Sequence, residues 1–195
     1  YRQEFLCDFS AACDNVLITI DLVSKAASKK LLPRDVEGAP RVIGVDVARF
    51  GDDRSSICKR EGLYCHDIDT VEKLDNMTVA GIVARQIDEF KPDAVFVDAG
   101  RGEGVIDRLR QLGYDVIETN FGHRAIEDKR YANKRSEMWD KVRAWIEAGG
   151  AIPNDSALKS DLSAPTYSFD AAGRMVLERK EHIKERGLRS PDLAD

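Results

Sequence analysis

Two aspartates, each embedded in or following an apolar run, are the residues of this chain best suited to carry out chemistry. Asp46 lies within RVIGVDVA at residues 41–48, and Asp98 directly follows Val95, Phe96 and Val97. An unpaired buried carboxylate is costly, so each should be protonated, paired or bound to a cation. If both runs are strands, the carboxylates can meet at one sheet edge, where they repel unless a cation lies between them. Oxygen ligands suit Mg²⁺ or Mn²⁺.

A second interpretation assigns each aspartate a purely local role. A single Asp at a strand end is commonly a turn former or a helix cap. The glycine-rich stretch DAGRGEG at 98–104 lacks the spacing of a phosphate-binding loop, and it predicts a backbone turn before a helix that starts at Gly104. Further carboxylates stand in SPDLAD near the C-terminus, at Asp192 and Asp195.

The hydrophobic pattern predicts the elements that must position these side chains. Residues 1–40 form a linker with a helical segment at 18–32, and residues 41–195 form the main domain. Alternating or continuous apolar runs predict strands at 41–48, 56–59, 63–68, 93–100 and 114–119. Helical spacing predicts helices at 78–90, 104–112, 131–148 and 156–162, and a last helix over 180–195. A hairpin is predicted at 166–178. The fold class is therefore α/β, with a mixed sheet flanked by helices and an added hairpin.

Composition limits the function classes. The 195 residues are 43% hydrophobic and 33% charged, which is typical of a globular domain with one sizeable core. No apolar run approaches the roughly 20 residues that a membrane span needs, so a membrane partner is not expected. The net charge of −5 argues against a general nucleic-acid coat but allows a local basic groove.

Two stretches, 123–143 and 174–189, carry more Lys and Arg than acidic residues. They predict groove walls that contact DNA phosphates without distinguishing bases. The alternative is that both are solvated helix faces with i,i+4 ion pairs. The predicted DNA-binding residues are Arg101, Lys129, Arg130, Lys134, Arg135, Lys180 and Lys184.

The motifs EFLCDF, VIGVDVARFGDDRSSICKREG, FVDAGRGEGVIDRLRQLG and SPDLAD, in that order, resemble the C-terminal nuclease domain of tailed-bacteriophage terminase large subunits. The resemblance implies a ribonuclease H-like fold and an endonuclease that cuts concatemeric double-stranded DNA with two Mg²⁺ or Mn²⁺ ions. It aligns Asp46, Asp98 and Asp192 with the catalytic metal ligands, with Asp195 as a second or alternative ligand on the last helix. The hairpin resembles one beside the family's active-site groove.

The same resemblance implies partners and a location. An ATPase domain would precede Tyr1 in a longer chain, and the portal protein and small terminase subunit would complete a packaging motor in the host cytoplasm. Two alternatives stay open: another ribonuclease H-like nuclease, such as a junction resolvase or hybrid nuclease, and a non-catalytic ribonuclease H-like docking module. A sugar-kinase or actin-like ATPase would need a duplicated domain, for which this chain is too short.

Overall fold

A mixed six-stranded sheet forms the centre of one half of the molecule. The structure is a computed structural model that describes residues 15–31, 33–47 and 54–194. The strand order is β3-β2-β1-β5-β6, with β4 also pairing with β2. The strands are β1 (Arg41–Asp46), β2 (Arg54–Glu61), β3 (Tyr64–Cys65), β4 (Asp69–Glu72), β5 (Ala94–Asp98) and β6 (Ile117–Thr119).

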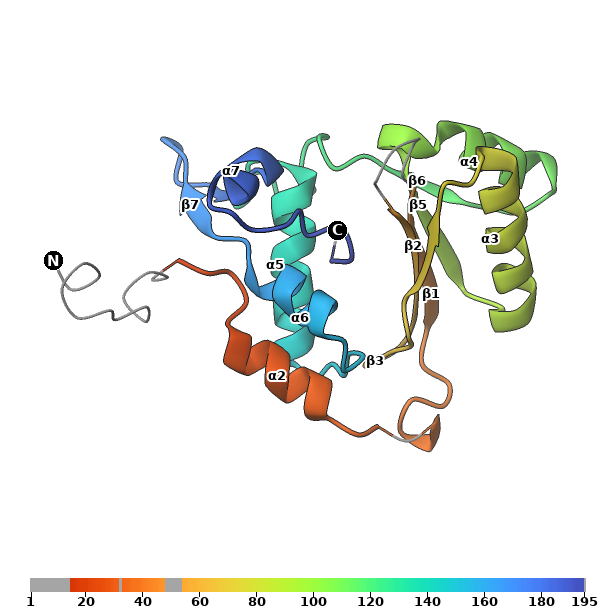
Figure 1. Ribbon diagram of the computed structural model, residues 1–195, viewed down its shortest axis with the longest axis horizontal. Helices are drawn as coiled ribbons and strands as arrows, with labels where there is room; N and C mark the ends of the chain where they lie inside the picture. The colour runs from red at the N-terminus through yellow and green to blue at the C-terminus, as the bar shows by residue number, and fades with distance from the viewer. Residues whose placement is uncertain (1–14, 32, 48–53, 195) are drawn as a thin grey trace, which may run out of the picture.

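Helices lie on both sides of this sheet (Figure 1). The helices are α2 (Ile20–Ser28), α3 (Asn76–Phe90), α4 (Ala99–Gln111), α5 (Lys134–Glu147), α6 (Ser156–Ser163) and α7 (Lys180–Glu185), with a 3₁₀ turn, η2 (Pro33–Asp35). A separate hairpin pairs β7 (Tyr167–Phe169) with β8 (Met175–Leu177). None of these helices is long and apolar enough to cross a membrane. The predicted mixed α/β sheet with flanking helices and a hairpin is confirmed.

Two hydrophobic clusters divide the molecule. The first packs α3 and α4 against one face of the sheet, around Ile43, Val45 and Val97. The second joins α2, α5, α6 and the hairpin, with Tyr131 and Trp139 among its buried members. Figure 1 shows α3 and α4 on one side of the sheet and this second group on the other.

Local signals explain where the longer helices begin and end. The Asp75 carboxylate accepts from the backbone N–H groups of Met77 and Thr78, so α3 starts two residues before the predicted Thr78. Helix α3 ends at a left-handed Lys91 before a proline, as its sequence predicts. The Asn133 side chain likewise caps α5, which starts at Lys134 instead of Tyr131.

The glycine-rich stretch after Asp98 is helical, so the predicted turn there is wrong. Helix α4 starts at Ala99, directly after β5, five residues before the predicted Gly104. A Cβ on Gly102 would lie 3.1 Å from Val47 Cγ2 and 3.3 Å from Val97 Cγ1. The glycine therefore allows α4 to pack tightly against the ends of β1 and β5.

The predicted last helix is also shorter than expected. Helix α7 ends at Glu185, and the chain runs on to a turn over 192–194. The N–H of Ala194 bonds to the carbonyl of Pro191, which closes this turn. Strand β4 was not predicted. In the structure the strand expected at 63–68 is limited to β3, and pairing with β2 resumes only at Asp69.

The packing around α4 predicts opposite effects for two glycine substitutions. Gly102→Val should destabilise the fold by about 1–3 kcal/mol, because the added methyls overlap Val47 and Val97. Gly81→Ala in α3 is the matched control, since its Cβ meets nothing within 4 Å, and it should stabilise by about 0.5–1 kcal/mol. Urea unfolding measures both. Equal midpoints for Gly102→Val and the parent would show that α4 tolerates a wider separation from the sheet.

Candidate metal centre and nucleic-acid interface

The two central aspartates lie at the same end of adjacent parallel strands. In the β1–β5 register Val45 pairs with Val97, so the next residue on each strand is an aspartate, Asp46 on β1 and Asp98 on β5. Asp46 also pairs across to Ser56 on β2, which makes it the last residue of a strand bonded on both sides. The predicted meeting of the two acids at one sheet edge follows from this register.

Both carboxylates belong to the sheet face that α3 and α4 do not cover. Side chains alternate along a strand, and Val45 and Val97 are buried on the α3/α4 face. Asp46 and Asp98 therefore point to the opposite face, and both are of intermediate exposure. That face is open nearby: a Cβ on Gly44 would meet nothing within 4 Å, Phe96 is 38% exposed and Ile117 is 46% exposed. These positions on the face are therefore accessible to solvent.

The local alternative for Asp98, a helix cap, is not realised. Asp98 occupies the N-cap position of α4, but its side chain makes no capping hydrogen bond. A Cβ on Gly100 would lie 3.1 Å from Asp98 Oδ2, so the carboxylate lies close to the first turn of α4. The positive end of the helix dipole favours an anion at this point.

Asp192 lies in a different setting from the strand-end pair. It stands in the turn that follows Pro191 and not in a helix, and its Oδ1 is 3.3 Å from Lys180 Nζ. The neighbouring N–H of Leu193 donates to Asp161 Oδ2 at 3.1 Å, which ties this turn to α6. Asp195 lies outside the described residues. Within the described part of the chain, no three His, Cys, Asp or Glu side chains are grouped so as to hold a metal ion.

Solved structures with a similar fold include the nucleases of bacteriophage large terminases. The nuclease domain of the large terminase subunit gp2 of bacterial virus Sf6 matches with a TM-score of 0.71 at 18% identity, covering 92% of this chain and 95% of that one. The large terminase nuclease from thermophilic phage G20c with bound magnesium has a TM-score of 0.60 at 16% identity, covering 93% and 97%. This chain has the terminase-nuclease fold.

The HK97 bacteriophage large terminase matches with a TM-score of 0.57 at 12% identity, over 84% of this chain and 39% of that one. Other matching structures are the Sf6 domain with manganese and the G20c nuclease with cobalt. No family model and no curated protein matches the chain. At these identities the likeness establishes the ribonuclease H-like architecture of terminase nucleases, and activity has to be argued from the site.

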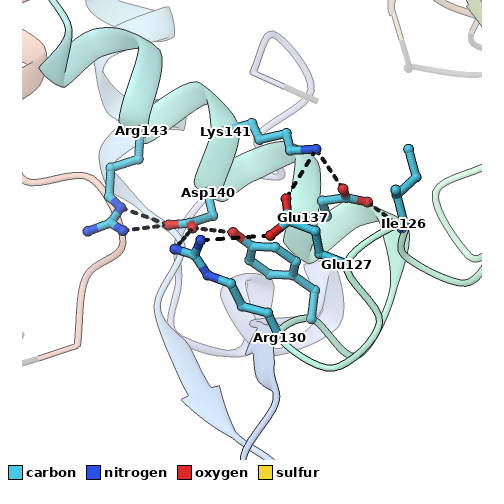
Figure 2. A network of polar contacts seen from close by, with 8 residues as sticks. Ile126, Glu127, Arg130, Glu137, Asp140, Lys141 and Arg143 are labelled. Atoms are coloured by element: carbon cyan, nitrogen blue, oxygen red, sulfur yellow. Dashed lines mark hydrogen bonds and ion pairs between the residues drawn. The ribbon is translucent and has the colours of Figure 1, made fainter.

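One acid buried in α5 of this terminase-nuclease fold, Glu137, binds two lysines of the basic stretch 123–143, and Figure 2 shows its contact with one of them, Lys141. Its side chain is fully buried. Lys141 Nζ lies 2.6 Å from Oε1, Lys134 Nζ lies 3.0 Å from Oε2, and the N–H of Ile126 donates to Oε2 at 2.8 Å. Burial alone raises the pKa of Glu137, but these three contacts outweigh it and lower the pKa from 4.5 to about 2.

A second buried acid, Asp140, lies one turn further along α5. Arg130 Nη2 donates to Oδ2 at 2.9 Å, and Arg143 Nε donates to Oδ1 at 2.9 Å. The hydroxyl of Tyr131 donates to the same Oδ2 at 2.5 Å. Burial of Tyr131 and its bond to Asp140 raise the pKa of this phenol, so it stays protonated as the donor. Asp140 is satisfied on both oxygens.

Neither interpretation of the basic stretches describes these contacts fully. The i,i+4 pair between Glu137 and Lys141 is present, but the acid is buried instead of solvated. Arg135, predicted to contact DNA, donates through Nη1 to the carbonyl of Glu178 at 2.8 Å and stacks over Trp139. These cations neutralise buried acids and tie α5 to the hairpin.

The predicted DNA-binding residues differ in their surroundings. Arg130, Lys134, Arg135 and Lys180 have the partners described above. Arg101, Lys129, Arg130 and Lys184 are exposed. Arg101 lies in the first turn of α4, three residues after Asp98.

Sequence reasoning missed three residues that line a pocket beside α5: Arg143, Tyr167 and Phe169. The alternation of the hairpin arm places the two aromatic residues two positions apart on one face. That spacing was available in the sequence, whereas the position of Arg143 beside them depends on how α5 packs against the hairpin.

Replacing the buried carboxylate should reveal its electrostatic contribution. Glu137→Gln removes the charge that Lys134 and Lys141 neutralise, and it should destabilise the fold by about 1–3 kcal/mol near pH 7. Because the folded pKa lies below the unfolded value of about 4.5, this contribution is present above pH 4.5 and is lost as the pH falls toward 2. Urea unfolding between pH 7 and pH 2.5 should therefore show a smaller acid loss in the variant.

The control for this prediction is Glu89→Gln in α3. Glu89 is 70% exposed and has an i,i+4 partner, Arg85, at 3.9 Å. Exposed pairs contribute little, so its substitution should change stability by less than about 0.5 kcal/mol. Identical acid sensitivity in Glu137→Gln and the parent would contradict the role assigned to the buried acid.

Proposed function

We propose that this chain is the metal-dependent endonuclease domain of a phage DNA-packaging terminase, which cuts concatemeric double-stranded DNA. The observation that carries the proposal is the placement of Asp46 and Asp98 at the matching ends of β1 and β5, on the open face of a terminase-nuclease fold. A purely structural role does not require two like charges on adjacent strands, because they destabilise each other without a cation.

The donor chemistry of this site fits Mg²⁺ or Mn²⁺. Asp46 and Asp98 supply hard oxygen ligands from rigid strand ends, and Asp192 or Asp195 would complete the set. Such ions, when a pair is bound, activate a water and stabilise the leaving oxygen in phosphodiester hydrolysis. Magnesium and manganese are named in structures of similar nucleases, which supports the choice of metal.

The remaining residues of the site would bind and orient the DNA. Asp46 pairs with Ser56 on β2 and the preceding Val45 pairs with Val97 on β5, so strand pairing on both sides of β1 holds this ligand in place. Such a fixed position is the preorganisation that hydrolysis requires. The exposed Arg101 side chain, beside Asp98 in sequence, suits a phosphate contact next to the scissile bond. Lys129 and Lys184 would contact phosphates further away.

The wider assembly follows from the same proposal. The HK97 large terminase is more than twice as long as the region matched here, which supports an ATPase domain elsewhere in a complete chain. The portal protein and the small terminase subunit would be the motor partners, in the host cytoplasm.

Cleavage assays with single Asp substitutions test the proposal. The parent should cut linear duplex DNA in Mn²⁺ or Mg²⁺ and stop in EDTA. Asp46→Asn and Asp98→Asn should each lower cleavage by about a hundredfold or more, because each removes a metal ligand. Each should keep the folded circular-dichroism signal, and stability without metal should hold or rise as one like charge is lost. Asp107→Asn, an exposed acid on α4, is the control and should cleave like the parent.

The substrate range separates the alternatives. Preferential cleavage of four-way junctions or of RNA–DNA hybrids would favour another ribonuclease H-like nuclease. Metal-independent cleavage would overturn the proposed mechanism, and absence of cleavage with all three substrates in Mn²⁺ would favour the docking module.

The identity of the third metal ligand can be tested through Lys180, which contacts Asp192 in the structure. If Asp192 is the ligand, Asp192→Asn should weaken Mn²⁺ binding in calorimetry by about tenfold or more. Lys180→Gln should strengthen it, because the ammonium 3.3 Å from Asp192 Oδ1 competes with the metal. If Asp195→Asn loses Mn²⁺ while both other variants bind like the parent, Asp195 is the principal third ligand.

A further inference from the structure

A pocket of about 390 Å³ lies between the hairpin, α5 and the segment that precedes α5. In Figure 1 the hairpin lies across α5 from the sheet that carries Asp46 and Asp98. The pocket therefore belongs to a different part of the molecule from the acid pair. Its lining residues are Leu17, Lys129, Arg130, Asp140, Arg143, Tyr167, Phe169, Gly173 and Met175.

Aromatic rings form one part of the pocket lining. Tyr167 and Phe169 lie on the same face of β7, with ring centroids 5.8 Å apart and ring planes at 85°. Phe169 is 66% exposed, so most of its ring is available to a ligand. Leu17 and Met175 are buried at the pocket and supply apolar contact. A flat ring placed here would meet both an aromatic surface and aliphatic side chains.

Three cations and one buried acid form the polar part. Arg130 and Arg143 both bind Asp140, whose side chain is 5% exposed, and Figure 2 shows them reaching it from different sides. One carboxylate thus holds two guanidinium groups that would otherwise repel each other. Lys129 adds an exposed ammonium. The pocket lining therefore carries a formal excess of positive charge.

Two further acids, Glu127 and Glu147, reduce this charge only weakly. Glu127 lies 4.0 Å from Arg130, and Glu147 lies 3.7 Å from Arg143. Both acids are about half exposed, and pairs of this kind contribute little in water. An anion that enters the pocket can replace them with little loss.

We propose that this pocket binds one unpaired nucleotide of a nucleic-acid strand, with its base against Phe169 and Tyr167 and its phosphate at Lys129, Arg130 and Arg143. The volume is at the lower end of the range for small-ligand pockets, which suits a single nucleotide. Stacking on aromatic rings requires an exposed base face, and a base inside a duplex is covered by its neighbours on both sides. The ligand is therefore unpaired.

The nucleotide identity of the ligand rests on the proposed nuclease function, and the site adds a second contact to the strand on the hairpin side of α5. An unpaired nucleotide arises where a strand end has separated from its complement. Binding there would hold a strand that has left the duplex.

Binding of labelled oligodeoxynucleotides by fluorescence anisotropy tests the proposal, using the chain with Asp46→Asn in EDTA so that cleavage does not contribute. Phe169→Ala should weaken binding of a single-stranded oligonucleotide by about tenfold, because stacking on the ring is lost. Binding of a blunt duplex, and of an abasic strand of equal length, should stay unchanged. Phe169→Trp should restore single-strand binding. Lys129→Gln should weaken binding of both the intact and the abasic single strand. It should also lower the slope of log affinity against log salt concentration by about 0.7.

Two control variants, one on α3 and one on α2, separate effects of the pocket from general effects on DNA binding. Met77→Ala removes a large side chain that is 54% exposed on α3, and Lys25→Gln removes an exposed charge on α2. Both should bind the single strand like the parent. The proposed nucleotide site would be overturned if Phe169→Ala and the parent bound the single strand with equal affinity. It would also be overturned if Phe169→Ala lost as much affinity for the abasic strand as for the intact one. Because no metal is present, this readout stands whether or not the chain cleaves duplex DNA.

Discussion

The parallel pairing of β1 with β5 is the constraint on which the rest of the structure depends. Its register places Asp46 and Asp98 side by side, and any slip by one residue would turn one carboxylate toward the buried α3/α4 face. The register is held by the apolar residues of both strands that pack against α3 and α4, Val45 and Val97 above all. The core therefore fixes the position of the acids through the strands that carry them.

Close packing at the same end of the sheet follows from that pairing. Helix α4 starts at the residue after Asp98, with no loop between strand and helix, so its first turn must approach the strand ends closely. Gly100 and Gly102 permit the approach, the first beside the Asp98 carboxylate and the second against Val47 and Val97. The glycines thus serve helix packing, and the carboxylate remains beside the helix N-terminus without acting as its cap.

Charge is distributed differently on the open face of the sheet and on α5, both of which belong to the side that α3 and α4 leave uncovered. On the open face, two acids meet at strand ends with an exposed arginine nearby in sequence. On α5, by contrast, Glu137 and Asp140 are buried, and four cations and a tyrosine hydroxyl satisfy them. A buried carboxylate is tolerated only with such partners, so much of the basic character of the 123–143 stretch maintains the fold. The exposed Lys and Arg side chains of this stretch are the ones that nucleic acid can contact.

The sequence by itself determined the fold class, the order of most elements, and the two aspartates that end apolar strands, because side-chain periodicity and strand-end chemistry are local properties. Its motifs also indicated the terminase-nuclease likeness. Only the tertiary structure decided that the glycine-rich stretch is helix, that Asp192 stands in a turn against Lys180, and that Lys134 and Arg130 neutralise buried acids. These outcomes depend on contacts between residues distant in the chain. A lysine that faces solvent and one that pairs with a buried glutamate look alike in sequence, because burial is set by packing and not by residue type.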